Sequence, residues 1–191
     1  MHIQRIIAAA TLGLAAMAGA QAADLYAFGS VGISDWKIDE TPGLNLDRKG
    51  TGFKLGVGSL LMPNLAVEGG YVNLGKAKLS GDGGRGSVKG GGVFVDAVGV
   101  LPLSSDFSAF AKLGIFHGKA KGEAESYPSG ESDGVRVSER DSGTDIKFGF
   151  GVGWSLSKSV QLRAEWERFR FKLSGDQGDV DLLSLGVSYS F

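Results

Sequence analysis

The sequence predicts an all-β fold: an eight-stranded antiparallel up-and-down transmembrane β-barrel. Three observations point to it. Apolar residues alternate with small or polar residues in eight segments, as they do in strands that have one apolar and one polar face. Short and long connections alternate between these segments. The last segment ends the chain on an aromatic residue, Phe191.

The eight segments have lengths that suit tilted membrane strands of about ten residues. They span residues 25–36, 52–61, 65–77, 88–101, 107–118, 144–156, 160–173 and 180–191. In chain order, their apolar faces begin with Leu25, Phe53, Leu65, Val93, Ala109, Ile146, Leu162 and Leu183.

The final strand shows the alternation most plainly. Over residues 183–191 the apolar side chains share one face, whereas serine and glycine fill the other. An aromatic chain end fits a strand whose apolar face meets lipid and whose end lies at a membrane interface. We expect this strand to pair with residues 25–36 and close the barrel. The terminal Val187, Tyr189 and Phe191 also resemble the C-terminal signal by which outer-membrane barrels are recognised for assembly.

The connections follow the pattern of an outer-membrane barrel, in which periplasmic turns are short and extracellular loops are long. Both termini then lie at the end with the short turns, so the number of strands is even. The short connections are residues 62–64, 102–106 and 157–159, and the longer ones are 37–50, 78–87, 119–143 and 174–179.

Residues 1–22 predict a secretory signal peptide. A positively charged start precedes an apolar run over residues 6–18, and residues 20–22 fit the small-x-small cleavage rule. The apolar run is too short to span a membrane as a helix. We therefore expect the barrel domain to comprise residues 23–191.

Composition excludes several classes of function. The chain has no cysteine, so disulfides, thiolate metal sites and cysteine nucleophiles are excluded. Its net charge of −1 gives no basic excess for nucleic-acid binding. Glycine-rich residues 81–86 and 90–92 lack the Gly-Lys-Ser/Thr ending of a phosphate-binding loop. We expect no metal, no cofactor and no nucleic-acid partner.

Charged residues occupy the faces opposite the apolar ones. An Arg or Lys facing lipid at the membrane midplane costs about 2–4 kcal/mol, so we place these charges in the lumen. An eight-stranded barrel is just wide enough to be filled by side chains, which predicts a salt-bridged plug. A gated pore lined by the same residues is one alternative. An acid/base catalytic pair such as Glu165 and Glu167 is another, but a large substrate could not reach it in so narrow a barrel. The predicted network comprises Lys54, Glu68, Asp96, Lys112, Lys147, Arg163, Glu165 and Glu167.

A weak internal repeat lies within these strands. Residues 53–56, 111–114 and 146–149 each place an inward glycine two positions after an inward lysine. We interpret the glycine as leaving lumen space for the long cation beside it.

The alternation changes phase near the middle of residues 160–173. Arg168, Arg170 and Lys172 continue the parity that is apolar before them. Either a β-bulge shifts the register, or the strand has left the hydrocarbon and these cations lie at headgroup level. There they would contact lipopolysaccharide phosphates or form a solvated charged rim.

Three stretches resemble OmpA-like small outer-membrane barrels: residues 62–75, the pair 98–103 and 110–114, and residues 162–168. The resemblance implies an outer-membrane location, reached through the periplasm and the barrel-assembly machinery. It also implies an interior ion network at Glu68, Lys112, Arg163 and Glu165. We expect the barrel alone, without the peptidoglycan-binding domain, so cell-wall tethering is not carried over.

Function in such barrels usually lies in loops on a rigid scaffold. We expect a monomer in contact with lipid and lipopolysaccharide, whose extracellular loops serve envelope integrity, adhesion or host-factor binding. A low-conductance channel is one alternative, and a secreted lipocalin-like barrel is another. Lipid A modification is a third, but His117 with Glu123, Glu125, Ser126 and Ser129 nearby shows no catalytic spacing. We expect no enzyme.

Overall fold

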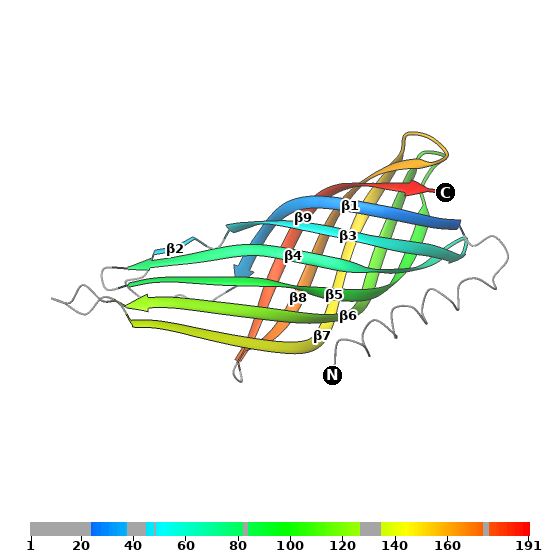
Figure 1. The fold of residues 1–191 in the computed structure, drawn as a ribbon. Coiled ribbons are helices and arrows are strands. Elements are labelled where there is room, and N and C mark those ends of the chain that lie inside the picture. The colour runs from blue at the N-terminus through cyan, green and yellow to red at the C-terminus, as the bar shows by residue number, and fades with distance from the viewer. Residues whose placement is uncertain (1–23, 38–44, 48, 82–83, 127–134, 174–175) are drawn as a thin grey trace.

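The computed structural model describes residues 24–37, 45–47, 49–81, 84–126, 135–173 and 176–191, whereas the predicted signal peptide lies outside these residues. Eight long antiparallel strands form a closed barrel, as the sequence predicts (Figure 1). A short ninth strand, β2 (Asn45–Asp47), pairs with the outer end of β4. The barrel strands are β1 (Asp24–Lys37), β3 (Lys49–Met62), β4 (Leu65–Gly81), β5 (Gly84–Pro102), β6 (Phe107–Ser126), β7 (Val135–Ser155), β8 (Val160–Leu173) and β9 (Asp176–Ser190).

The barrel closes between its first and last strands. β1 pairs antiparallel with β9 in an unbroken register from Tyr26 opposite Ser190 to Lys37 opposite Asp179. Beyond the ladder, the backbone N–H of Phe191 donates a 3.0 Å hydrogen bond to the carbonyl of Leu25. The predicted closure is confirmed, and the start of β1 and the end of β9 lie at the end with the short turns, the turn end.

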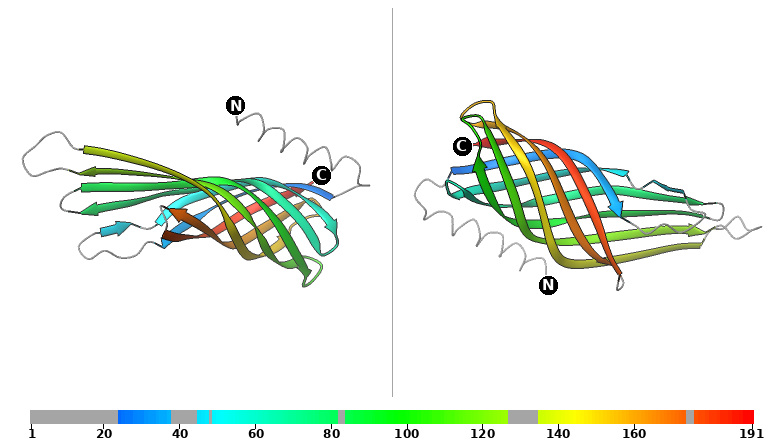
Figure 2. Two further views of the ribbon diagram at one scale, coloured as in Figure 1. Left: turned by 90° about the horizontal axis from the view of Figure 1, so that it is seen from below. Right: turned by 180° about the vertical axis from the view of Figure 1, so that it is seen from behind.

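Three of the four predicted longer connections are wrong, because most of each is strand. The shortest, residues 174–179, is strand from Asp176 onward, where β9 begins. β4 and β5 stay paired as far as Gly81 opposite Gly84, and β6 and β7 as far as Ser126 opposite Val135. These hairpins project beyond the rest of the barrel at the end opposite the turns, the hairpin end (Figures 1 and 2). A strand surrounded by water on both faces needs no apolar face, so hydrogen bonding continues where alternation stops.

The outer surface of the barrel is apolar. Side chains such as Val31, Leu113, Phe150 and Leu185 are each more than half exposed and form a band around the strands. A soluble lipocalin-like barrel would place its apolar face inside and its charges outside, so that alternative is wrong. Among the described residues, no helix is long and apolar enough to cross a membrane.

The interior has three layers, because inward positions change in character along each strand. Small apolar side chains and Phe110 lie near the turn end. Charged side chains fill the middle. A larger apolar cluster fills the interior near the hairpin end, and it includes Trp36, Phe94, Phe116 and Phe169.

Candidate functional site

Eight charged side chains from six strands converge inside the barrel, and none is more than 6% exposed. Strand alternation explains the convergence, because every second residue points inward. β3 contributes Lys54, β4 contributes Glu68, β5 contributes Asp96, β6 contributes Lys112, β7 contributes Lys147, and β8 contributes Arg163, Glu165 and Glu167.

Four of these residues form a closed ring of ion pairs. Lys112 Nζ lies 2.7 Å from Glu68 Oε2 and 2.8 Å from Glu165 Oε2. Arg163 completes the ring, with Nη2 2.8 Å from Glu68 Oε1 and Nε 2.8 Å from Glu165 Oε1. The hydroxyl of Tyr26 donates a further 2.9 Å hydrogen bond to Glu68. Within the ring, each carboxylate therefore contacts both cations.

The other four residues extend the ring towards the hairpin end. Lys54 bridges Glu165 and Glu167, and its Nζ lies 2.5 Å from Glu167 Oε2. Lys147 Nζ lies 2.8 Å from Glu167 Oε1 and 2.5 Å from Asp96 Oδ2. All eight residues thus belong to one connected network, in which every cation contacts two carboxylates.

Aromatic faces surround the cations. Lys147 Nζ lies 4.5 Å from the centre of the Phe94 ring, and the guanidinium carbon of Arg163 lies 4.6 Å from the centre of the Phe110 ring. A desolvated cation over a ring face gains about 2 kcal/mol. Removing one charge from such a buried network would leave its partner uncompensated, which costs far more than a surface ion pair contributes.

The inward glycines lie closest to residues other than the lysines for which we expected them to leave space. A Cβ at Gly149 would lie 2.7 Å from Cγ of Glu167. A Cβ at Gly114 would meet the carboxylate of Asp96, and a Cβ at Gly56 would meet the ring of Phe28. These glycines leave room for backbone carbonyls, two carboxylate side chains and an aromatic ring, and none of the three atoms nearest to each Cβ belongs to the lysine on the same strand.

Sequence reasoning missed the apolar cluster that covers the network on the hairpin side. Phe116 and Phe169 pack edge to face with ring centres 5.2 Å apart, and both are almost fully buried. The signal was present in the sequence, because Phe94 and Phe169 have the same inward parity as Asp96 and Glu167 two residues away.

The network is approached from the turn end. A cavity of about 370 Å³ there is lined by Tyr26, Glu68, Arg163, Gln161 and Ser188 among others. Its lining combines polar and apolar side chains and leads from the short turns to the ring of ion pairs. The interior is therefore a vestibule that ends at a charged plug.

The cations of β8 lie on the outer face near the hairpin end. The ladders of β8 with β7 and β9 contain no register shift over their paired residues, so the bulge alternative is wrong and the strand continues past the apolar band. Arg168 donates two hydrogen bonds of 2.6 and 2.8 Å to Asp181. The side chain of Arg170 is 53% exposed, and its Nε lies 3.9 Å from Asp179. The side chain of Lys172 lies outside the described residues.

The end of β9 and its terminal residue present an aromatic edge to the outside. Val187, Tyr189 and Phe191 are all exposed on the outer face. The rings of Tyr189 and Phe191 pack edge to face with centres 5.3 Å apart. This aromatic pair marks the turn end of the apolar band.

His117 lies on the exposed outer face of β6. Its Nδ1 is 2.8 Å from Oγ1 of Thr144 on β7. The side chains of Glu123, Glu125 and Ser126, and the whole of Ser129, lie outside the described residues. Among the residues that the structure describes, no group of His, Cys, Asp and Glu could hold a metal ion.

Comparison with known proteins gives matches over most of the chain. Residues 6–191 match the family model described as the outer membrane protein beta-barrel domain. Outer membrane protein A of Klebsiella pneumoniae is 32% identical over 137 residues, which cover 68% of this chain and 38% of that protein. The protein of the same name from Klebsiella aerogenes is 28% identical over 97% of this chain and 54% of that protein. The chain thus spans less than two thirds of these relatives.

Solved structures share the fold at low sequence identity. Ail, the attachment invasion locus protein of Yersinia pestis, has a TM-score of 0.59 and 22% identity, covering 90% of this chain and 100% of that one. Neisserial surface protein A has a TM-score of 0.55 and 14% identity, covering 87% and 97%. The N-terminal barrel domain of Pseudomonas aeruginosa OprF has a TM-score of 0.51 and 13% identity, covering 90% and 100%.

Proposed function

This chain belongs to the outer membrane protein β-barrel domain family and lies in the Gram-negative outer membrane, and from that premise we propose that it is a closed scaffold for surface interaction. The turn end with both barrel termini faces the periplasm, and the projecting hairpins face the outside, as in bacterial outer-membrane barrels. The hairpins serve adhesion, host-factor binding or envelope integrity.

The observation that carries this proposal is the sealed interior. The ion network fills the middle of the lumen, and the apolar cluster around Phe94, Phe116 and Phe169 covers it on the outer side. An ion crossing the barrel would have to separate paired, buried charges and then pass a hydrocarbon layer. These barriers favour a plug over a channel. We therefore assign function to the surface at the hairpin end.

The hairpins β4–β5 and β6–β7 form that surface. Their four strands extend further than β1, β8 and β9 (Figure 2). A hydrogen-bonded sheet holds its outer residues in a defined arrangement, which lowers the entropy cost of binding a partner. We propose that the chain works as a monomer, without catalysis and without a cofactor, and that the barrel-assembly machinery inserts it.

Shortening one hairpin without disturbing the barrel tests this role. Residues 121–140 are replaced by Asn-Gly, a two-residue turn that keeps Ala120 opposite Asp141. A second variant shortens the other hairpin: it replaces residues 79–86 and keeps Lys78 opposite Ser87. We expect loss of adhesion or serum survival in the first variant, with outer-membrane fractionation and heat-modifiable gel migration unchanged in both. If adhesion, serum survival and envelope integrity are normal in both variants, the proposed role is wrong.

Planar bilayers separate the scaffold from the channel alternative. We expect the purified protein to give no discrete current steps, because every lumen cation is paired. Discrete steps whose amplitude changes in Lys112→Gln or Glu68→Gln would establish conduction through the lumen and overturn the sealed scaffold.

A further inference from the structure

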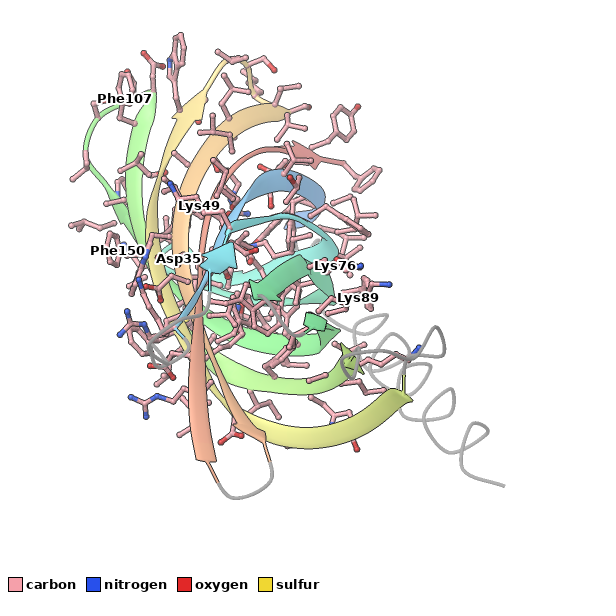
Figure 3. All side chains as sticks on the ribbon, turned by 90° about the vertical axis from the view of Figure 1, so that its left-hand side faces the viewer. Asp35, Lys49, Lys76, Lys89, Phe107 and Phe150 are labelled. Atoms are coloured by element: carbon pink, nitrogen blue, oxygen red, sulfur yellow. The ribbon has the colours of Figure 1, made fainter. Side chains whose placement is uncertain are left out.

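Three lysines from adjacent strands surround a shallow cavity on the outer face near the hairpin end. Lys49 lies on β3, Lys76 on β4 and Lys89 on β5. They line a cavity of about 490 Å³ together with the polar residues Thr51 and Asn73. Viewed from the hairpin end, Lys76 and Lys89 point away from the barrel (Figure 3).

A β-bulge creates this arrangement. β4 has one residue more than β5 between the pairs Asn73–Gly91 and Lys76–Lys89. Gly75 occupies the bulge at φ 75°, in the left-handed region that glycine adopts readily, and its N–H donates a 2.8 Å hydrogen bond to Asn73 Oδ1. In an unbroken strand Lys76 would have the inward parity of Leu74. The bulge turns it outward, directly opposite Lys89.

The arrangement concentrates positive charge without a described counter-charge. Like charges directly opposite each other in a sheet are destabilising. Among the described residues, none of the three lysines forms an ion pair, whereas Arg168 on β8 is held by Asp181. Asp35 lies opposite Lys49 in the ladder, but its carboxylate is 2.6 Å from Nζ of Lys37. An anion in the cavity would offset the repulsion.

The height of the cavity relative to the apolar band indicates which part of the membrane such an anion would occupy. Phe53 and Val93 are the outermost large apolar residues on the outer faces of their strands, and Lys49 and Lys89 lie four positions beyond them. Four residues span about 13 Å of strand, or about 10 Å along the membrane normal at the usual tilt. Phe53 also packs against Tyr71, with ring centres 6.2 Å apart, as aromatic residues do at an interface. The cavity therefore opens sideways at headgroup level.

We propose that Lys49, Lys76 and Lys89 bind a phosphate group of a lipid headgroup in the outer leaflet. Lysine binds phosphate as a point charge, and all three lysines line the same cavity. The hydroxyl of Thr51 and the amide nitrogen of Asn73 supply neutral donors beside them. The site depends on the membrane location and not on the role of the hairpins.

The test compares lipids that differ in one phosphate. The purified protein is placed in phosphatidylcholine bilayers containing diphosphorylated or monophosphorylated lipid A, and its thermal midpoint is followed by heat-modifiable gel migration. We expect diphosphorylated lipid A to raise the midpoint by several degrees in the wild type. The variant K76Q/K89Q should lose at least half of that rise. Lys158→Gln, at an exposed periplasmic turn, removes the same charge elsewhere and should keep the full rise.

Two further measurements, one on a second variant and one with inorganic phosphate, complete the test. Lys49→Gln is a second, single-charge variant, and it should also reduce the rise. Inorganic phosphate added to plain phosphatidylcholine bilayers should give no comparable rise. The proposal is overturned if K76Q/K89Q and Lys49→Gln both respond to lipid A as the wild type does. It is equally overturned if inorganic phosphate alone reproduces the stabilisation, because the ligand would then be a soluble anion.

Discussion

Lys112 and Glu68 meet inside the barrel with 2.7 Å between Nζ and Oε2, although 44 positions separate them in the sequence. β6 carries the lysine and β4 the glutamate, and β5 lies between them. The pair therefore forms across the curved inner surface and not along one ladder. Its geometry depends on the closed shape of the barrel.

Removing one member of this pair should destabilise the barrel strongly. Lys112→Met leaves buried carboxylates short of one cation, and breaking a buried ion pair in this way costs about 3–5 kcal/mol. The double variant K112M/E68Q restores the charge balance and should recover part of the loss. Urea unfolding in lipid vesicles measures both. A double variant at least as unstable as the sum of the single variants would contradict a shared network.

The inward glycines should be intolerant of a methyl group. Gly149→Ala pushes Cβ against Glu167, and overpacking of this kind costs about 1–3 kcal/mol. Gly99→Ala is the matched control, because a Cβ at Gly99 has no heavy atom within 4 Å. Urea unfolding of the two variants gives the comparison. Equal stability of both would show that the interior has room that the structure does not contain.

Deletion of Phe191 should impair membrane insertion more than its contacts suggest. Phe191 is 78% exposed, so its removal sacrifices little buried area, but we expect it to form part of the assembly signal with Val187 and Tyr189. Phe107→Ala removes an exposed aromatic side chain at the same end and should insert normally. Outer-membrane fractionation and heat-modifiable migration report insertion. Normal insertion of the deletion variant would count against the signal.

His117→Ala should leave the composition of lipid A unchanged, because we expect no catalysis. The imidazole lies beside the Thr144 hydroxyl on the exposed outer face, and a histidine–hydroxyl pair alone does not make a triad. Mass spectrometry of lipid A from cells with and without the protein, and with the variant, measures this. A modification present with the wild type and lost in the variant would establish an enzyme.

The cations of β8 should contribute to lipopolysaccharide contact. Arg170 has the more exposed side chain, whereas Arg168 is held by Asp181. Replacing Arg168 and Arg170 by Ser should therefore slow folding in bilayers that contain lipopolysaccharide, with little change in plain phosphatidylcholine. Unchanged folding rates in both bilayers would remove these residues from the lipid contact.

Alternation predicted the strands best where one face meets lipid and the other meets the lumen. The predicted bounds of β8, Val160 and Leu173, agree with the structure. The strands predicted for β6 and β7 are shorter than the observed ones, because residues 119–126 and 135–143 continue as strands above the membrane. Outside lipid, no penalty for exposed polar groups enforces alternation, so the sequence carries a weaker signal there.

Parity identified which charged side chains share the inner surface, but it could not pair them. Lys54 contacts Glu165 and Glu167, which are more than 110 positions away. That contact depends on the register of several ladders and on the curvature of the closed sheet. The bulge at Gly75 was missed for a related reason, because a single extra residue changes parity without changing composition.

The position of Lys54 has a consequence for the closure of the barrel. Lys54 lies on β3 and its two carboxylate partners lie on β8, on opposite sides of the seam between β1 and β9. The contacts of Lys112, Lys147 and Arg163 join strands that are linked through β4 to β8 without crossing that seam. The two ion pairs of Lys54 therefore span the seam, and like the pair of Arg163 with Glu68 across the barrel they depend on the closed sheet. The ion pairs of Lys54 with Glu165 and Glu167 are therefore a feature of the completed barrel.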